Sequence, residues 1–206
     1  RSAILTGRTP YRNGVWRHLS GSHEAHLRAS EITYPELLKE AGYETCHVGK
    51  WHLLAKPQFN TPKFPQPGDH GYDYWMYSQN NAIPSHKNPN NFVRNGEPVG
   101  EIKGYSAQIV ATEAIHWLEE VHDPKKPFAL SVWVHEPHSP IATDPKFSEL
   151  YSGHKNSKYM GNITQLDTAL GQVMDSLDKA GVADNTLIFF TSDNGPVASY
   201  GGTTGG

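Results

Sequence analysis

Three apolar runs, each the length of a β-strand, are followed directly by clusters of polar residues. The runs are Tyr43 to Val48, Phe128 to Val134 and Leu187 to Phe190, and their composition favours strands. The clusters that follow them are Gly49-Lys50-Trp51-His52, His135-Glu136-Pro137-His138 and Thr191-Ser192-Asp193-Asn194-Gly195-Pro196. Ligand sites of open α/β sheets gather at the edge where such strands end. The pattern therefore predicts one pocket suited to an anion and a hard metal ion.

Stretches with helical periodicity separate the predicted strands. Thr33 to Ala41 has an N-cap followed three residues later by Glu36, and Gly42 ends it. Apolar residues recur along one helical face over Tyr105 to Val121 and again over Tyr159 to Ala180. Strands that alternate with helices predict an α/β fold, a mostly parallel sheet covered by helices on both faces. The order of the strands stays open.

Residues 53–104 interrupt this alternation. The segment is rich in Pro, Asn and Gly and has little sustained period, which predicts loops that carry short elements. Its aromatic residues Tyr72, Tyr74, Trp75 and Tyr77 have two interpretations. They either stack on a sugar or form a packed cluster.

Composition excludes some classes of partner. The 206 residues carry a net charge of −3 and only 19% charged residues, so no broad basic field is available for nucleic acid. The apolar stretches are too short to cross a bilayer. Cys46, the only cysteine, lies within the first predicted strand and is interpreted as a small buried residue. The chain starts at Arg1 and ends in a Gly-rich run, so we expect 1–206 to be an internal fragment.

The candidate site residues each allow a structural alternative. Asp193 and Asn194 offer the hard oxygen ligands that Ca²⁺ or Mg²⁺ prefers, but the same residues are typical of a turn. Lys50 and His52 lie two apart, so in an extended chain both contact one oxyanion from the same face. The alternative for these two is a solvated lysine and a histidine with a structural hydrogen bond.

The two histidines of the second cluster are predicted to lie in a turn. Pro137 biases Glu136 toward extended geometry, which disfavours helical pairing of His135 with His138. Zinc is a minor alternative, because no Cys cluster or helical HExxH motif completes such a site.

Five motifs, taken in order, resemble the type I sulfatase family. The segment from Arg1 to Val15 resembles the stretch that ends and follows the family's Cys-x-Pro-Ser-Arg signature, and residues 49–53 resemble its second signature. The further matches are Gly71-Tyr72-Asp73, Pro137-His138-Ser139-Pro140 and Ser192-Asp193-Asn194-Gly195-Pro196. The resemblance covers nearly the whole chain. It implies an alkaline-phosphatase-like α/β fold of which this chain is a partial domain.

The resemblance also implies the cofactors and the role of each residue. The family uses Ca²⁺, with Mg²⁺ the less expected ion, and a formylglycine made from a Cys or Ser that would lie four positions before Arg1. By resemblance, Arg1 steadies the hydrated aldehyde, and His52 bonds to it and helps to remove its proton. Lys50 and His138 bind the sulfate, with His138 near the leaving oxygen. Asp193 and Asn194 ligate the metal.

The implied function is hydrolysis of a sulfate monoester, in which a metal and fixed cations stabilise the charge that develops on the ester oxygens. The substrate would be a small sulfate ester or a sulfated carbohydrate. The implied partner of the full-length protein is a formylglycine-generating enzyme, and the implied location is periplasmic, secreted or lysosomal. The chain alone is expected to be inactive. The alternatives are a phosphonate or phosphodiester hydrolase of the same superfamily, or a non-catalytic anion- or glycan-binding module.

Overall fold

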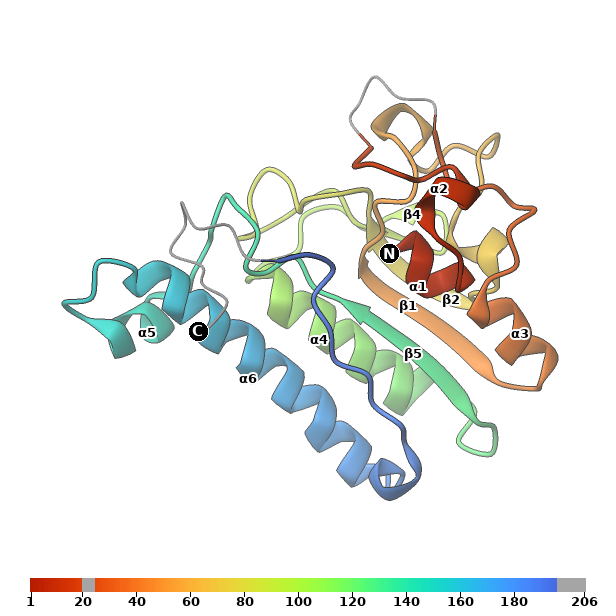
Figure 1. Cartoon of the computed structure of the whole chain (residues 1–206). Coiled ribbons are helices and arrows are strands. Elements are labelled where there is room, and N and C mark those ends of the chain that lie inside the picture. Colours follow the sequence, from red (N-terminus) through yellow and green to blue (C-terminus); the bar gives the residue numbers. More distant parts are fainter. Residues whose placement is uncertain (20–24, 196–206) are drawn as a thin grey trace.

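The computed structural model describes residues 1–19 and 25–195, and its centre is a mixed sheet of five strands. The sheet order is β4-β3-β2-β1-β5, with the parallel part formed by β2, β1 and β5 (Figure 1). β3 and β4 extend it as an antiparallel hairpin. The strands are β1 (Glu44–Lys50), β2 (Tyr74–Ser78), β3 (Val93–Arg94), β4 (Glu97–Pro98) and β5 (Phe128–Trp133).

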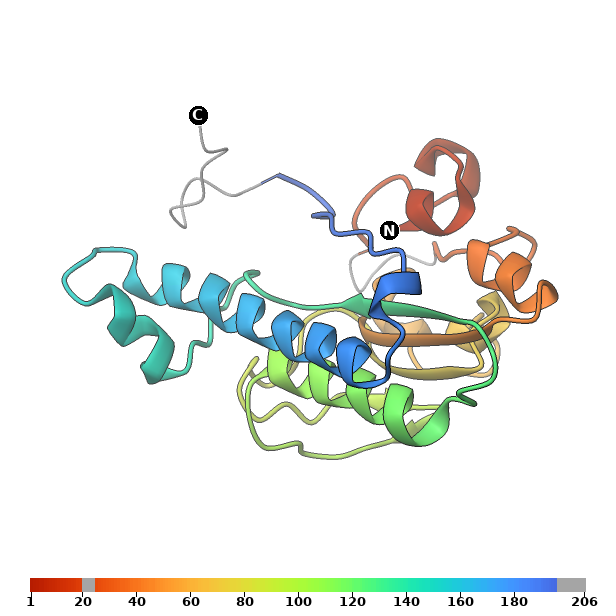
Figure 2. The same ribbon diagram turned by 90° about the horizontal axis from the view of Figure 1, so that it is seen from below.

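One face of the sheet is covered by two long helices. α4 (Ser106–His116) packs against β1 and β5, and α6 (Ser157–Lys179) packs against α4 (Figure 2). Successive side chains of a strand point to opposite faces, so Cys46 and Val48 of β1 lie in this layer together with Met76 of β2. Cys46 is buried, as the sequence predicted.

The other face is covered by the short N-terminal helices α1 (Ser2–Thr6), α2 (Pro10–Asn13) and α3 (Tyr34–Glu40). A second apolar cluster fills this layer, and it includes Trp51, Tyr72 and Tyr77. Tyr72 and Tyr77 are 1% and 0% exposed. Of the two interpretations of the aromatic residues, the packed cluster is therefore correct for these tyrosines.

The predicted helices are confirmed. The Glu36 carboxylate accepts a hydrogen bond from the backbone N–H of Thr33 at 2.8 Å, which completes the capping box of α3. α4 continues into a π-helical turn over Trp117–Val121, so the two elements together match the predicted helix 105–121. The remaining short helices are η1 (Lys56–Gln58), η2 (Pro67–His70), α5 (Pro145–Ser148), η4 (Glu149–Tyr151) and η5 (Ala183–Asn185).

Two predictions about strands need revision. The first two predicted strands are β1 and β5, but residues 187–190 form no strand. Leu187 and Phe189 are 78% and 85% exposed, because composition sets only a propensity and this run has no ladder partner within residues 1–19 and 25–195. Conversely, β2 lies inside the segment predicted as loops with short elements, and pairing with β1 makes it a full strand of the sheet.

Gly49 allows the central strand to fit against its neighbour. It lies opposite Trp133 of β5 with φ = 106°, in the region that favours glycine. A Cβ atom at this position would lie 2.0 Å from the Trp133 carbonyl oxygen and 3.3 Å from Val110 Cγ1 of α4. No side chain larger than hydrogen fits there without displacing backbone.

We expect Gly49→Ala to lower the free energy of unfolding by on the order of 3 kcal/mol, because the substitution adds a backbone clash to an unfavourable φ. Gly96→Ala is the matched control, since Gly96 has φ = 92° but nothing within 4 Å of the added Cβ. Urea unfolding of both variants separates the clash from the φ effect. Equal losses would show that the contact with Trp133 costs nothing.

Candidate functional site

Lys50, the last residue of β1, places an ammonium group at the carboxyl edge of the sheet. The residue is only 4% exposed, and its Nζ donates to the amide oxygen of Asn81 at 3.4 Å. Burial lowers the pKa of Lys50 to about 8, and the positive charge of Arg1 lowers it further while Asp193 opposes the shift. The side chain is therefore a partly desolvated cation at neutral pH, suited to binding an anion.

The chain turns directly after β1, so Lys50 and His52 do not share an extended strand. His52 has φ = 54°, which corrects the assumption behind their predicted common face. Trp51 is buried in the core, while His52 is only half-buried. The two side chains still lie close enough for the charge of Lys50 to act on His52.

His52 is neutral at physiological pH. Burial lowers its pKa to about 4, and the charges of Lys50 and Arg1 contribute to the shift. Its Nε2 lies 3.2 Å from the carbonyl oxygen of Leu19, which can only accept a hydrogen bond. Nε2 therefore carries the proton in this arrangement, and Nδ1 is left as an acceptor for a proton.

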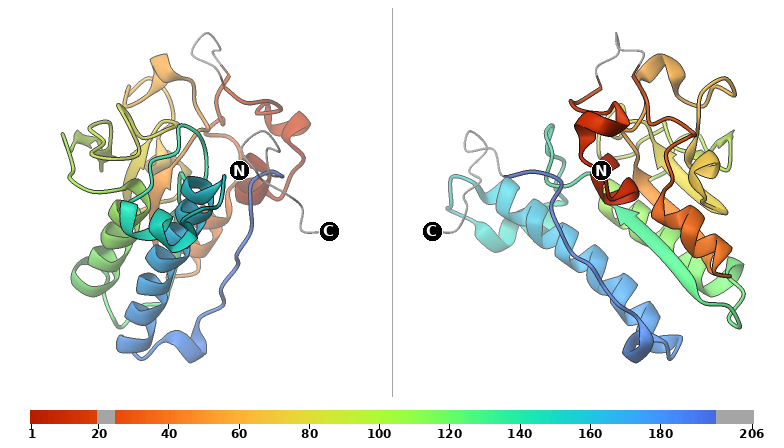
Figure 3. Two further views of the ribbon diagram at one scale, coloured as in Figure 1. Left: turned by 90° about the vertical axis from the view of Figure 1, so that its left-hand side faces the viewer. Right: turned by 45° about the vertical axis from the view of Figure 1, so that its right-hand side comes forward.

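Arg1 contacts Asp193 directly, which joins the first and last parts of the site. The guanidinium Nη1 forms an ion pair with the Asp193 Oδ2. Figure 3 shows the segment after α6 rising past the sheet toward the N-terminus, in agreement with this contact. Burial lowers the pKa of Arg1, with Asp193 opposing the shift.

The predicted turn over residues 135–138 is confirmed. The backbone N–H of His138 donates to the carbonyl of His135 at 2.9 Å. His135 is buried and its Nε2 lies 2.7 Å from Ser78 Oγ, whereas His138 is exposed and its Nδ1 lies 2.5 Å from the carbonyl of Ser139. The imidazoles of His135 and His138 bond to different groups, Ser78 and Ser139, instead of facing a common point. This arrangement is evidence against the zinc interpretation.

A chain of hydrogen bonds links this turn to the end of β1. Asn81 accepts from Lys50 and donates from its Nδ2 to the Ser139 carbonyl at 3.2 Å, and His138 bonds the same carbonyl. His86 also lies close by, since the charges of His138 and Lys50 act on its pKa. Burial lowers that pKa to about 4.

Sequence reasoning missed Asn81, Ser78 and His86 as parts of this site. His86 lies in a segment without regular periodicity, yet it is fully buried. The missing signal was strand β2: once Tyr74–Ser78 is known to run parallel to β1, the residues after Ser78 must reach the same sheet edge as Lys50.

The proposed metal ligands are of the right chemical type. Asp193 supplies a carboxylate and Asn194 an amide, the hard oxygens that Ca²⁺ prefers. The Asp193 carboxylate contacts Arg1, and the Asn194 amide donates to the carbonyl of Gly195 at 2.9 Å. Across the described ranges, no cluster of three His, Cys, Asp or Glu side chains is placed to hold a metal. Ca²⁺ takes six to eight oxygens, so this pair fits as part of a larger set.

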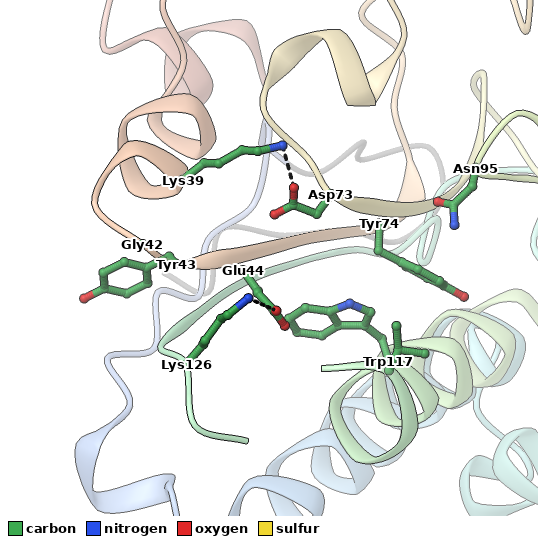
Figure 4. A pocket seen from close by; sticks show the side chains of 10 residues that line it. Lys39, Gly42, Tyr43, Glu44, Asp73, Tyr74, Asn95, Trp117 and Lys126 are labelled. Carbon is green, nitrogen blue, oxygen red and sulfur yellow. Dashed lines mark hydrogen bonds and ion pairs between the residues drawn. The ribbon is translucent and has the colours of Figure 1, made fainter. Parts of the chain in front are cut away.

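A groove lies at the opposite, amino edge of the parallel strands, and the charged side chains in it form ion pairs with one another (Figure 4). Its lysines are already neutralised: Lys39 pairs with Asp73 at 2.5 Å, and Lys126 pairs with Glu44 at 2.9 Å. Partial burial acts against the ionised Glu44, but hydrogen bonds from the Asp123 backbone, Lys126 and His122 outweigh it and lower its pKa to about 2. This groove is a structural ion-pair cluster rather than the site.

The family model for sulfatases matches residues 1–205. The chain belongs to the sulfatase family. Among curated relatives, it is 32% identical over 218 residues to mouse (Mus musculus) N-acetylgalactosamine-6-sulfatase and 31% identical over 218 residues to the uncharacterised sulfatase YdeN of Escherichia coli. These alignments cover 95% and 96% of the chain, but only 40% and 38% of the relatives. The chain thus spans about two fifths of their length.

Solved structures support the same fold. The crystal structure of Ps i-CgsB matches with a TM-score of 0.85 and 25% identity, covering 98% of this chain and 49% of that one. The fold is therefore part of the alkaline-phosphatase-like architecture of sulfatases, as the sequence predicted. In the part of the chain that the structure describes, no helix has the length and apolar character needed to span a membrane.

Burial of the Lys50 charge is expected to reduce stability. Because folding lowers its pKa from 10.5 to about 8, the folded state binds fewer protons between these values, and stability rises as pH increases through that window. We expect Lys50→Met to raise the free energy of unfolding at pH 7 by on the order of 3 kcal/mol, with the gain shrinking toward pH 10.5.

Denaturant unfolding at several pH values measures this effect. Lys126→Met is the control, because Lys126 is exposed and its pKa is raised by Glu44, so its loss brings no gain in stability. A Lys50→Met protein less stable than the parent at pH 7 would contradict the expectation.

Proposed function

We propose that this chain forms part of the catalytic domain of a sulfatase that hydrolyses sulfate monoesters. The observation that carries the proposal is the gathering of Arg1, Lys50 and neutral His52 at one sheet edge, with Asp193 against Arg1. Two partly buried cations suit a tetrahedral oxyanion, and an imidazole that stays neutral at physiological pH is available to accept a proton. Family membership supports the same reaction class.

The cations act on the charge that develops as the ester bond breaks. Cleavage of the S–O bond leaves negative charge on the sulfuryl oxygens and on the leaving oxygen, and Lys50 and Arg1 stabilise this charge from fixed positions. In this family a formylglycine supplies the nucleophilic oxygen and Ca²⁺ polarises the sulfate, and Asp193 and Asn194 would hold that ion as part of its ligand set. The formylglycine implies a modifying enzyme as a partner.

Two imidazoles divide the proton transfers between them. Nδ1 of His52 is free to accept a proton, since Nε2 is directed at the Leu19 carbonyl. Nδ1 of His138 is directed at the Ser139 carbonyl, which leaves its Nε2 exposed to donate a proton to the leaving oxygen. We propose His52 as the base and His138 as the acid.

We propose a sulfated carbohydrate as the substrate class. The mouse relative is named for an N-acetylgalactosamine 6-sulfate, and a structure of Ps i-CgsB contains k-i-k-neocarrahexaose. This chain is consistent with that class, because the exposed His138 and the loop of Asn81 lie at the same sheet edge as Lys50, where they would contact the alcohol part of the ester.

The full-length protein is expected to hydrolyse 4-nitrophenyl sulfate and a sulfated sugar. Chelation by EDTA should abolish turnover and added Ca²⁺ should restore it, and mass spectrometry of the peptide ending at Arg1 should find a formylglycine. Bis(4-nitrophenyl) phosphate and a phenylphosphonate monoester are the controls. Faster hydrolysis of either control than of any sulfate would assign the chain to a phosphoryl-transfer enzyme instead.

Substitutions at the two basic positions should separate binding from chemistry. His52→Ala removes the base and is expected to lower kcat by about 10²–10⁴-fold with a smaller change in KM. Lys50→Ala removes a cation that binds the sulfate in the ground state and binds the developing charge more strongly in the transition state, so KM rises and kcat falls. His154→Ala is the control, because His154 is an exposed histidine between η4 and α6 and has no proposed role in the site. Identical effects of the two substitutions on kcat and KM would refute the division of roles.

A further inference from the structure

Glu136 has no part in the proposed chemistry, although it lies between the two histidines of the 135–138 turn. The residue is 5% exposed, which is unusual for a carboxylate and requires compensating hydrogen bonds. Its Oε1 accepts from Ser106 Oγ at 2.6 Å and from the backbone N–H of Ala107 at 3.0 Å. Both donors belong to the first turn of α4.

Glu136 thereby satisfies the amino end of a helix that packs on the sheet. The first N–H groups of any helix lack partners within the helix, and a negative charge there interacts favourably with the helix dipole. Burial raises the pKa of Glu136, while the bonds from Ser106 and Ala107 oppose the shift. The carboxyl group thus links an irregular turn to a helix that is buried against the sheet and α6.

The other residues of the same turn contact strand β2 and the loop that follows it. His135 contacts Ser78 at the end of β2, and the Ser139 carbonyl accepts from Asn81, itself a loop residue. His138 is exposed, and the interaction of its ring with Ser139 is local to the turn. The position of His138 relative to the sheet therefore depends on how its neighbours are anchored, and Glu136 makes two of these bonds.

We propose that Glu136 is a positioning residue for His138, holding the 135–138 turn on the amino end of α4 so that the imidazole meets the leaving oxygen of the sulfate ester. The proposal rests on the proposed function, because it needs His138 to donate the proton. Displacement of the donor by as little as about 1 Å costs about 10²-fold in rate.

A series of phenyl sulfates tests this role in the full-length protein, because it varies the need for a proton donor. 4-Nitrophenolate is a weak base that leaves with little protonation, whereas 4-methylphenolate depends on an acid. We expect Glu136→Ala to slow kcat for 4-methylphenyl sulfate by about 100-fold and for 4-nitrophenyl sulfate by only a few-fold. Glu136→Gln keeps an acceptor oxygen for Ser106 and Ala107 and should stay close to the parent on both.

Glu113→Ala is the matched control. Glu113 is also a buried carboxylate on α4, but it accepts from Arg94 at 2.6 Å and from Tyr74 at 2.5 Å, away from the turn. This variant should lose stability and affect all the phenyl sulfates equally. If Glu136→Ala fails to fold, Ser106→Ala, which removes one of the two bonds, should still slow 4-methylphenyl sulfate selectively.

The possible failures can be told apart. A parent protein that turns over no sulfate overturns the proposed function, and the role of Glu136 with it. A parent that is active, with Glu136→Ala or Ser106→Ala slowing all substrates by the same factor as Glu113→Ala, overturns the positioning role alone and leaves the sulfatase proposal intact.

Discussion

The close approach of Gly49 to the carbonyl of Trp133 is the constraint on which the site depends. It brings the end of β1 against β5 where a Cβ would lie 2.0 Å from that oxygen. One residue later, Lys50 leaves the sheet beside Ser78 of β2, and the chain then turns at His52. Strands β2 and β5 lead respectively to Asn81 and to the 135–138 turn. The close fit at Gly49 and the parallel registers of β2, β1 and β5 thus bring three loops together at one edge.

The same arrangement places charge where it weakens the fold. Lys50 is nearly fully buried and contacts a neutral amide, so the protein keeps a cation out of water without full compensation. An anion bound at this edge would supply the missing partner and recover part of that cost. The buried charge of Lys50 thus lowers the stability of the free protein and raises its affinity for an anion. Active sites commonly show this relation between stability and function.

Local signals explain what the sequence predicted well. Helices were found because Thr33, Glu36 and Gly42 mark ends, and because apolar residues recur along α4 and α6. Strand β2 was expected only as one of the short elements of residues 53–104, because its place in the sheet depends on pairing with β1 and β3, which the local sequence does not show. The prediction of a strand over residues 187–190 was wrong for the opposite reason. These residues have strand propensity, but within residues 1–19 and 25–195 no neighbouring strand pairs with them. Lys50 lies at the end of β1 as its position in the sequence indicates, and Arg1 contacts Asp193, but Asn81 could be assigned to this edge only once β2 was known.

The two edges of the parallel strands show which charges belong to function. At the amino edge, Glu44 and Asp73 are matched to lysines, and their bonds account for the low pKa of Glu44. At the carboxyl edge, Lys50 and Arg1 share the influence of a single aspartate, Asp193, and His52 is kept neutral beside them. An excess of positive charge with partial burial is unfavourable unless an anion completes it. The edge with unbalanced charge is therefore the one suited to a ligand, rather than the groove at the amino edge, whose lysines are paired.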